Sequence, residues 1–266
     1  MKLPKLLDLQ NEDHRLLYNY DIKQLGSGDP YVMGLGQINR IYDILRYVRK
    51  HCNKGLCLDI GCAQAYVALL LAEHGLTSVG FDINYNFLTY AKIKWEKGKV
   101  FWVTGNAANL SFKRNSFDII ILGEILEHAA YPENIIMEAM NILKKGGYCI
   151  ITTPNGERVG SKLPNYSRSR DFLDILVRKQ YGPGGKDHLF AFTKMELRKM
   201  LEKLGLKVIY SRNRRTFLLN RVLDKIFYLR RLHIPISLYL FIDEILSRIP
   251  IINRKITDSL FIVVRK

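Results

Sequence analysis

The stretch LCLDIGCAQAYVALLLAEHG, residues 56–75, decides the fold. Leu56–Ile60 is apolar enough for a buried strand, and a turn of small residues leads from it into a helix predicted over Ala65–Glu73. Strand–turn–helix units of this kind bind nucleotides when two or three glycines shape the turn. Here only Gly61 remains. The turn is therefore a working cofactor site, a weakened one or an ordinary strand–helix junction.

The alternation of strand and helix continues along the chain. The apolar run FDIIIL, Phe117–Leu122, is typical of a parallel strand that is covered on both faces. Repeated alternation with short connections predicts an α/β fold with a parallel sheet and right-handed crossovers. The other predicted strands are Ser78–Phe81, Lys99–Thr104, Tyr148–Thr153, Lys207–Tyr210 and Ser259–Val264, and the other predicted helices are Asn86–Lys97, Pro132–Lys145 and Lys194–Leu204.

Composition narrows the class of protein. The chain has 266 residues, 48% of them hydrophobic, which indicates a globular core rather than disorder. Its 41 Lys and Arg against 25 Asp and Glu give a net charge of +16, which favours anionic partners or serves solubility. The four cysteines form no CxxC pair and are expected to be reduced thiols. No signal peptide or membrane-spanning run is visible, so a cytoplasmic protein is expected.

Polar residues follow three consecutive predicted strands. Asp59 and Gly61 follow the first, Asp82 ends the second 23 residues after Asp59, and Asn106 and Ala107 follow the third. Ligands of open α/β sheets lie at these strand ends. Asp82 has the spacing of a carboxylate that accepts hydrogen bonds from both ribose hydroxyls of an adenosine, and Asn106 lies where the adenine edge is expected.

Asp59 distinguishes the predicted ligand from a dinucleotide. A carboxylate two residues before Gly61 would repel a pyrophosphate, but it suits a cofactor with a cationic amino-acid tail. S-adenosylmethionine has both a sulfonium and an ammonium group. It is therefore the predicted cofactor.

The motif order resembles a known family. LDIGCAQAY, VGFD, GNAANLSF and SFDIIILGEILEHAAYPENIIMEAMNILKKGGYCIITTPN are similar to the class I S-adenosylmethionine-dependent methyltransferases, and more narrowly to the ubiquinone-biosynthesis O-methyltransferase branch. The resemblance covers residues 55–154 and resumes over 187–209. It implies a Rossmann-like α/β fold, with a seven-stranded, mostly parallel sheet, helices on both faces and an antiparallel last strand. The cofactor-binding residues that it implies are Asp59, Gly61, Ala63, Ala65, Asp82, Ile83, Asn106, Ala107 and Gly123.

The resemblance also divides the chain. A single methyltransferase domain over residues 1–266 is expected. Its expected parts are an N-terminal helical cap (1–54), the cofactor-binding core (55–154), an insertion over the active site (155–190), the end of the sheet (191–211 and 257–266) and a basic amphipathic insertion (212–256).

Three positions depart from the family pattern. The family usually has glycine where Ala63 and Ala65 stand, and an acid where Asn106 stands. An alanine at positive φ costs about 1 kcal/mol. An amide oxygen still accepts a hydrogen bond from the adenine amino group, but without the help of a charge. A real but weakened cofactor site is expected. A non-catalytic S-adenosylmethionine-binding scaffold is the alternative.

The segment Gly123–His128 carries the residues for chemistry. If it is helical, Glu124, Glu127 and His128 share one face at spacings i, i+3 and i+4. His188 lies in the DHLFAFT segment, which the family folds over the same mouth. The set resembles the Glu-x-x-Glu-His plus distant His site of metal-dependent RNA 2′-O-methyltransferases.

Three interpretations of this set remain open. Glu124, Glu127, His128 and His188 are candidate ligands of a divalent metal such as Mn, Zn or Mg, which would lower the pKa of an acceptor hydroxyl. His128, His188 or Glu124 is otherwise the candidate general base. The third interpretation is structural, because acids near a helix start oppose its dipole.

The basic segment 212–256 has ten Lys and Arg and three acids, interleaved with apolar runs such as ISLYLFI. Such a mixture suits an anionic membrane surface or a lipid-tailed substrate, and would make the protein peripheral on the membrane. A lid or a dimer interface is the alternative, and the oligomeric state is open. Nucleic acid is less favoured because no RNA-binding module is visible. The predicted reaction is O-methylation of a small-molecule or lipid-linked hydroxyl, with RNA 2′-O-methylation second.

Overall fold

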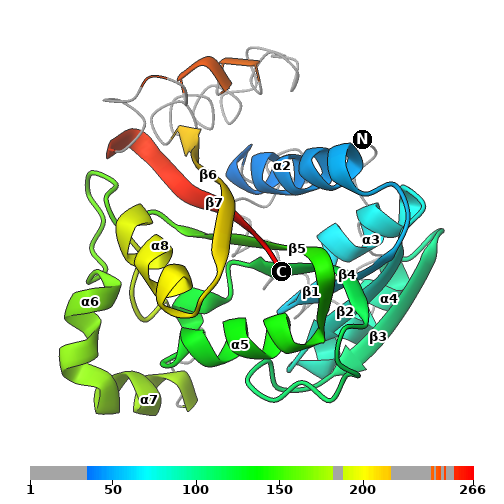
Figure 1. Cartoon of the computed structure of the whole chain (residues 1–266), viewed down its shortest axis with the longest axis horizontal. Coiled ribbons are helices and arrows are strands. Elements are labelled where there is room, and N and C mark those ends of the chain that lie inside the picture. Colours follow the sequence, from blue (N-terminus) through cyan, green and yellow to red (C-terminus); the bar gives the residue numbers. More distant parts are fainter. Residues whose placement is uncertain (1–34, 182–187, 217–240, 243, 247–248, 250–254) are drawn as a thin grey trace, which may run out of the picture.

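The computed structural model describes the chain except for residues 1–34, 182–187, 217–240, 243, 247–248 and 250–254 (Figure 1). The described chain forms a three-layer α/β fold around one seven-stranded sheet. The strands are β1 (Leu56–Ile60), β2 (Thr77–Asp82), β3 (Lys99–Thr104), β4 (Phe117–Gly123), β5 (Leu143–Pro154), β6 (Lys207–Thr216) and β7 (Thr257–Arg265). The helices are α2 (Leu35–His51), α3 (Tyr66–Glu73), α4 (Tyr85–Lys94), α5 (Pro132–Ile142), α6 (Tyr166–Ser169), α7 (Leu173–Tyr181) and α8 (Lys194–Lys203).

The strand order confirms the predicted fold. It is β3-β2-β1-β4-β5-β7-β6, and β7 runs antiparallel to both of its neighbours, whereas the pairs from β3 to β5 are parallel. From β1 the chain continues outwards through β2 to β3, and it then crosses to β4 on the other side of β1. The direction in which strands are added therefore reverses between β1 and β4. Ligands of open sheets bind beyond the carboxyl ends of the strands at such a reversal. Asp59, Asp82 and Gly123 all lie at this edge.

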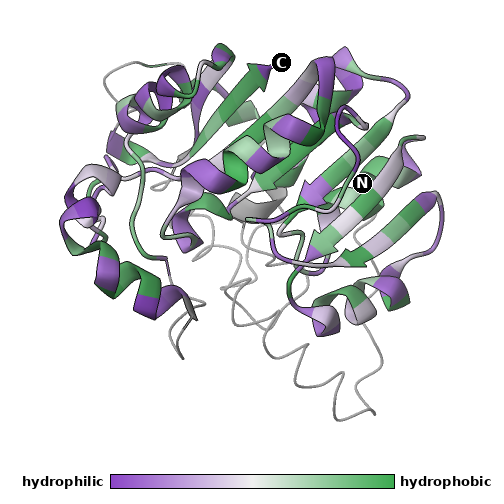
Figure 2. Cartoon of the chain, turned by 60° about the horizontal axis from the view of Figure 1, so that its bottom comes forward, coloured by the Kyte–Doolittle hydropathy of each residue, from purple (hydrophilic) through white to green (hydrophobic). Residues whose placement is uncertain are grey.

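Alternating side chains of β4 build the two cores. Ile120 and Leu122 pack with α5 and α8 on one face, and Ile119 and Ile121 pack with α2 and α3 on the other. All four isoleucine and leucine side chains are buried, which explains the unbroken apolar run. Figure 2 shows these strands as hydrophobic bands between helices of mixed hydropathy.

Several predicted boundaries were wrong. The helix predicted over Asn86–Lys97 ends at Lys94, and the strand predicted from Tyr148 begins at Leu143. The helix predicted over Pro132–Lys145 ends at Ile142, because Leu143 already pairs with Phe117 in the sheet. The strand predicted to end at Tyr210 continues to Thr216, where it pairs with Thr257 of β7. The first residues of the expected basic insertion therefore belong to β6.

Other expectations concern segments at the edges of the fold. The described part of the expected N-terminal helical cap (1–54) contains the helix α2, and the expected insertion over residues 155–190 contains α6 and α7. Most of the basic segment and residues 1–34 lie outside the described residues. All four cysteines are free thiols, as expected. Within the described chain, no helix combines the length and the apolar character needed to cross a membrane.

Candidate functional site

The turn after β1 has the shape of a glycine-rich loop. Gly61, Ala63 and Ala65 have φ values of 70°, 46° and 57°, so all three lie in the left-handed region. A Cβ at Gly61 would come within 2.6 Å of the Ile125 Cδ1 atom, so the Ile125 side chain would have to shift, and the φ of 70° also favours glycine. At the other two positions alanine adopts the conformation that glycine adopts more readily. The loop shape is therefore retained although two glycines are missing.

Asp82 holds this loop in place. Its Oδ2 atom accepts a hydrogen bond from the Ala63 amide at 2.8 Å, and its Oδ1 atom accepts one from the Asn84 amide at 2.8 Å. The side chain is buried, and burial raises its pKa while the amide bonds oppose that shift. Each carboxylate oxygen has a second lone pair, so both can still accept a ligand hydroxyl. The sequence did not predict the bond to Ala63.

Asp59 is buried at the end of β1 beside a cation that the sequence analysis missed. Burial raises the pKa of Asp59 to about 7, and the nearby Arg40 guanidinium lowers it. Arg40 comes from α2, and its Nη1 atom lies 2.9 Å from the position of a Cβ on Gly123. The only signal in the sequence was a cation one turn before the buried Ile44. Arg40 thus places a positive charge at the carboxyl ends of β1 and β4.

The predicted adenine side of the site is more open. Ile83 is 70% exposed directly after Asp82. Asn106 is also exposed, and its Oδ1 atom accepts a hydrogen bond from the Ala108 amide at 2.9 Å. The Gly105 amide donates to the Asp82 carbonyl at 3.1 Å, which holds Asn106 and Ala107 next to the end of β2. All three polar strand ends thus meet at one edge, as predicted.

The segment after β4 is not the predicted α-helix. Glu124 has a left-handed φ of 57°, and only Leu126–His128 form a single 3-10 turn. The Glu124 amide still donates to the Thr152 carbonyl of β5 at 2.9 Å, so the chain stays extended until it turns there. The expected spacing of Glu124, Glu127 and His128 on one helical face was therefore wrong.

Three of the four predicted metal ligands nevertheless lie together. One ligand atom from each of Glu127, His128 and His188 lies within 4.8 Å of the others, and Glu124 is outside this group. The His128 and His188 rings meet edge to face with centroids 4.7 Å apart. The His188 Nε2 atom is 3.9 Å from the Glu127 Oε1 atom. We call these three residues the Glu–His–His cluster.

Backbone contacts bring the distant His188 to this cluster. The Leu189 amide donates to the Glu127 carbonyl at 2.8 Å, and bridges join Ala191 to Asn165 and Phe192 to Asn155. The segment after His188 thus lies across the 3-10 turn. The prediction that this segment folds over the same mouth agrees with these contacts.

Glu127 is the buried member of the Glu–His–His cluster. Its side chain is 0% exposed, and its Oε2 atom accepts a hydrogen bond from the Thr153 hydroxyl at 3.0 Å. The Oε1 atom accepts no hydrogen bond from the described residues. Burial, followed by the charge of Glu124, raises the pKa of Glu127 well above its ordinary value. A buried carboxyl with an unused oxygen beside two imidazoles suits a proton or a metal ion.

Comparisons with known proteins agree with this geometry. Residues 58–151 match the sequence profile of a family described as "Methyltransferase domain". A ubiquinone biosynthesis O-methyltransferase from Aliivibrio fischeri is 28% identical over 180 residues, which are 65% of this chain and 73% of that protein. Over residues 58–151 the chain is therefore similar to the class I S-adenosylmethionine-dependent methyltransferases, the family that the sequence motifs resemble.

Further relatives support the same family. An enzyme from Dinoroseobacter shibae with the same name as the Aliivibrio protein is 29% identical over 164 residues, which are 59% of this chain and 62% of that enzyme. A crystal structure of an S-adenosylmethionine-dependent methyltransferase from Archaeoglobus fulgidus has the same fold, with a TM-score of 0.58 and 18% identity over 94% of this chain and 99% of the other. The similarity to this family implies S-adenosylmethionine as the cofactor, in agreement with the sequence motifs. The individual cofactor contacts and the role of the Glu–His–His cluster stay predictions.

Proposed function

We propose that this methyltransferase transfers the methyl group of S-adenosylmethionine to a hydroxyl oxygen of a small-molecule or lipid-linked acceptor. The observation that carries the proposal is the Glu–His–His cluster at the end of β4, next to the cofactor loop. Oxygen attack requires that the hydroxyl loses its proton, which needs a base or a metal. The names of the O-methyltransferase relatives support the same class of reaction.

The residues around the loop fit the parts of the cofactor. Asp82 would accept hydrogen bonds from the two ribose hydroxyls, and the exposed Ile83 would pack against the adenine ring. The second lone pair of the Asn106 amide oxygen would accept from the adenine amino group. Arg40 would bind the carboxylate of the amino-acid tail, and Asp59 would favour its ammonium group through charge.

His188 is the proposed general base. Its half-exposed ring can reach an acceptor, and its Nε2 atom faces the Glu127 carboxyl. In the reaction the acceptor oxygen forms a bond to the methyl carbon as the carbon–sulfur bond breaks, and the hydroxyl proton passes to the imidazole. Because the pKa of Glu127 is raised, this carboxyl can take up a proton from the imidazole afterwards. Replacing His188 with alanine would then lower turnover by roughly 10²–10⁴-fold without weakening cofactor binding.

The same cluster is the proposed site of a divalent metal in the alternative mechanism. One carboxylate and two imidazoles suit Mn or Zn better than Mg. A cation would favour the ionised form of Glu127 and would lower the pKa of an acceptor hydroxyl. When bound, it would supply Lewis-acid activation. Glu124 is not among the residues whose ligand atoms lie within 4.8 Å of one another.

A chelator experiment separates the two mechanisms. Under the metal mechanism, chelator inactivates the enzyme, Mn or Zn restores it, and both Glu127→Gln and His188→Ala abolish metal uptake. Under the base mechanism, chelator has no effect. His51→Ala is a matched control, because His51 is a histidine of α2 outside the cluster. Full activity in chelator would refute the metal mechanism, and full activity of His188→Ala would refute both.

The site of methylation is testable directly. The enzyme is incubated with S-adenosylmethionine that carries an isotope-labelled methyl group and with a cell extract, and the labelled product is identified by mass spectrometry. Methyl ethers survive alkali, whereas methyl esters are hydrolysed. An alkali-stable label on oxygen supports the proposal. A label on nitrogen or carbon would contradict it.

A further inference from the structure

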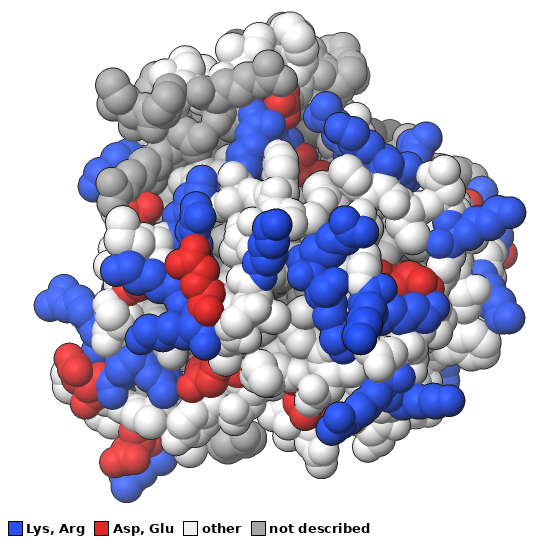
Figure 3. Space-filling view, in the orientation of Figure 1, with Lys and Arg blue, Asp and Glu red and all other residues white. Residues whose placement is uncertain are grey.

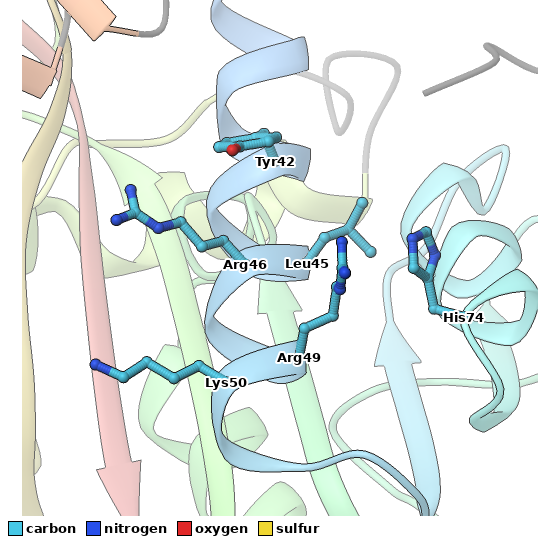
Figure 4. Close-up of a pocket in the computed structure, with 6 residues that line it drawn as sticks. All are labelled: Tyr42, Leu45, Arg46, Arg49, Lys50 and His74. Carbon is cyan, nitrogen blue, oxygen red and sulfur yellow. The ribbon is translucent and has the colours of Figure 1, made fainter. Parts of the chain in front are cut away.

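A basic pocket lies on α2, away from the cofactor loop. It has a volume of about 500 Å³ and is lined by Tyr42, Leu45, Arg46, Arg49, Lys50 and His74 (Figure 4). No acid is among these residues. Figure 4 shows Arg46 and Lys50 reaching to one side of the helix, whereas Leu45 and Arg49 point towards His74 of α3. We call this the α2 pocket.

The position of the α2 pocket separates it from the cofactor site. Arg40 lies at the carboxyl ends of the strands. Arg49 is nine residues further along α2, which separates the two residues by about 14 Å along the helix axis at a rise of 1.5 Å per residue. His74 is the C-cap of α3, whose other end begins at the cofactor loop. A ligand of the α2 pocket therefore does not compete with the cofactor.

The cations of the α2 pocket are available to a ligand. Arg49 and Lys50 are exposed, and no acidic side chain of the described residues pairs with either. Arg46 is 61% exposed and has only a long contact of 3.7 Å with Glu244. The His74 Nδ1 atom lies 2.6 Å from the Leu70 carbonyl, and because a carbonyl only accepts, this nitrogen carries its proton there. Figure 3 shows that basic side chains outnumber acidic ones on the face of the molecule seen in Figure 1.

Exposed apolar side chains lie in the segment whose Glu244 contacts Arg46. Phe241 and Ile245 are 61% and 47% exposed and are helical residues spaced i, i+4, so they share one face. Ile249, four residues after Ile245 in the sequence, is also 39% exposed, and we call Phe241, Ile245 and Ile249 the apolar row. Glu244 connects this row to α2 through Arg46, and it is itself neutralised by Arg212 at 2.8 Å and Arg214 at 2.6 Å.

We infer that the α2 pocket and the row Phe241, Ile245 and Ile249 form a docking surface for a membrane that contains anionic phospholipid. The guanidinium and ammonium groups would bind headgroup phosphates, and the apolar row would enter the acyl boundary. Two of the three residues of the row, Ile245 and Ile249, are aliphatic and cannot stack on bases, so the row favours a membrane over nucleic acid. A soluble phosphate would leave the row without a partner. The sequence predicted such a role for residues 212–256, and the described residues add α2 to it.

Vesicle co-sedimentation of the full chain tests the inference. The probes are vesicles of phosphatidylcholine alone and of phosphatidylcholine mixed with phosphatidylglycerol. Binding is expected only to the mixed vesicles and should fall as salt rises. Each cation near the surface is worth about a factor of five in partitioning, so Arg49→Gln with Lys50→Gln should weaken binding by about 30-fold.

Matched variants distinguish a site from net charge. Lys199→Gln with Lys203→Gln removes two exposed cations from α8, on the opposite face of the sheet, and should leave binding within twofold. Phe241→Ser with Ile245→Ser should weaken binding and preserve its salt dependence. The assay involves no methyl transfer, so its failure is distinct from a failure of the proposed reaction.

Four outcomes would overturn the inference. They are equal binding to both vesicles, no binding to either, equal losses in the α2 and α8 variants, and release by millimolar inorganic phosphate at constant ionic strength. RNA binding that is lost in the α2 variant, without vesicle binding, would assign the α2 pocket to nucleic acid instead.

Discussion

Replacing Ala63 or Ala65 with glycine tests the strain in the cofactor loop. Both alanines have a left-handed φ, which costs an L residue about 1–2 kcal/mol. Glycine removes this cost, but it increases the freedom of the unfolded chain by about 0.4–1 kcal/mol. At Ala63 the Cβ is only partly buried, so little packing is lost. Ala63→Gly should therefore raise the free energy of unfolding by about 0.5–1 kcal/mol.

Ala65 has the same backbone strain but a different environment. It is 0% exposed and packs with Ala68, Leu88 and Ala91. Removing its methyl group loses about 0.8 kcal/mol of burial, so Ala65→Gly should be neutral or slightly destabilising. Ala68→Gly is the control without left-handed strain. It should lose about 2 kcal/mol from burial and helix propensity together.

Thermal unfolding of the three variants measures these differences. For a chain of this size, 1 kcal/mol shifts the midpoint by about 2–4 °C. The expected order of midpoints is Ala63→Gly highest, then wild type and Ala65→Gly, with Ala68→Gly lowest. A midpoint of Ala63→Gly below that of the wild type would show that the left-handed alanine is not strained, and would refute the reasoning.

Three further predictions concern charged residues. The pKa of Asp59 is about 7 in the folded protein, above its ordinary value of 3.8, so between these two pH values the folded state binds more protons than the unfolded state. The free energy of unfolding should therefore fall as pH rises from about 4 to about 7. Asp59→Asn should flatten this part of a profile of urea midpoint against pH, and an unchanged slope would contradict the assignment. Asp82→Ala should weaken S-adenosylmethionine binding by about 2 kcal/mol in calorimetry, and unchanged affinity would argue against its ribose role. Arg214 is 6% exposed and pairs with Asp43 and Glu244. Arg214→Met would leave both acids without this partner, so it should lower the free energy of unfolding in denaturant by about 3–5 kcal/mol. A decrease below about 1 kcal/mol would mean that the two acids are solvated.

The sheet could be predicted from the sequence because its signals are local. The run Phe117–Leu122 is apolar on both faces, and both faces are covered. The polar residues that end three strands meet at one edge because parallel strands end on the same side. The family resemblance added the antiparallel last strand. These predictions needed no knowledge of distant contacts.

The parts that were missed depend on contacts between distant segments. Glu124 was expected in a helix because of its spacing to Glu127, but its amide pairs with Thr152 of β5 and the chain turns there. In the sequence, Arg40 is only a cation near an apolar helix face. Its place at the cofactor edge of the sheet is visible only from its closeness to Gly123 at the end of β4. Periodicity predicts the face of a helix but not which strand end it will cover.

The cofactor loop keeps its shape although Ala63 and Ala65 replace two glycines, because contacts with the neighbouring strand hold it. The amides of Gly61 and Cys62 both donate to the Phe81 carbonyl, at 2.8 and 3.1 Å, and the Ala63 amide donates to Asp82 at 2.8 Å. These bonds would be lost if Ala63 left the left-handed region, and an unpaired buried amide costs about 1–3 kcal/mol. That cost is at least as large as the backbone strain, so the strained conformation persists. Asp82 thus shapes the loop, and it is also the proposed acceptor for the ribose hydroxyls. A substitution that removes its carboxylate should therefore disturb the loop as well as cofactor binding, whereas Asp82→Asn keeps one acceptor oxygen and should preserve the loop better than Asp82→Ala.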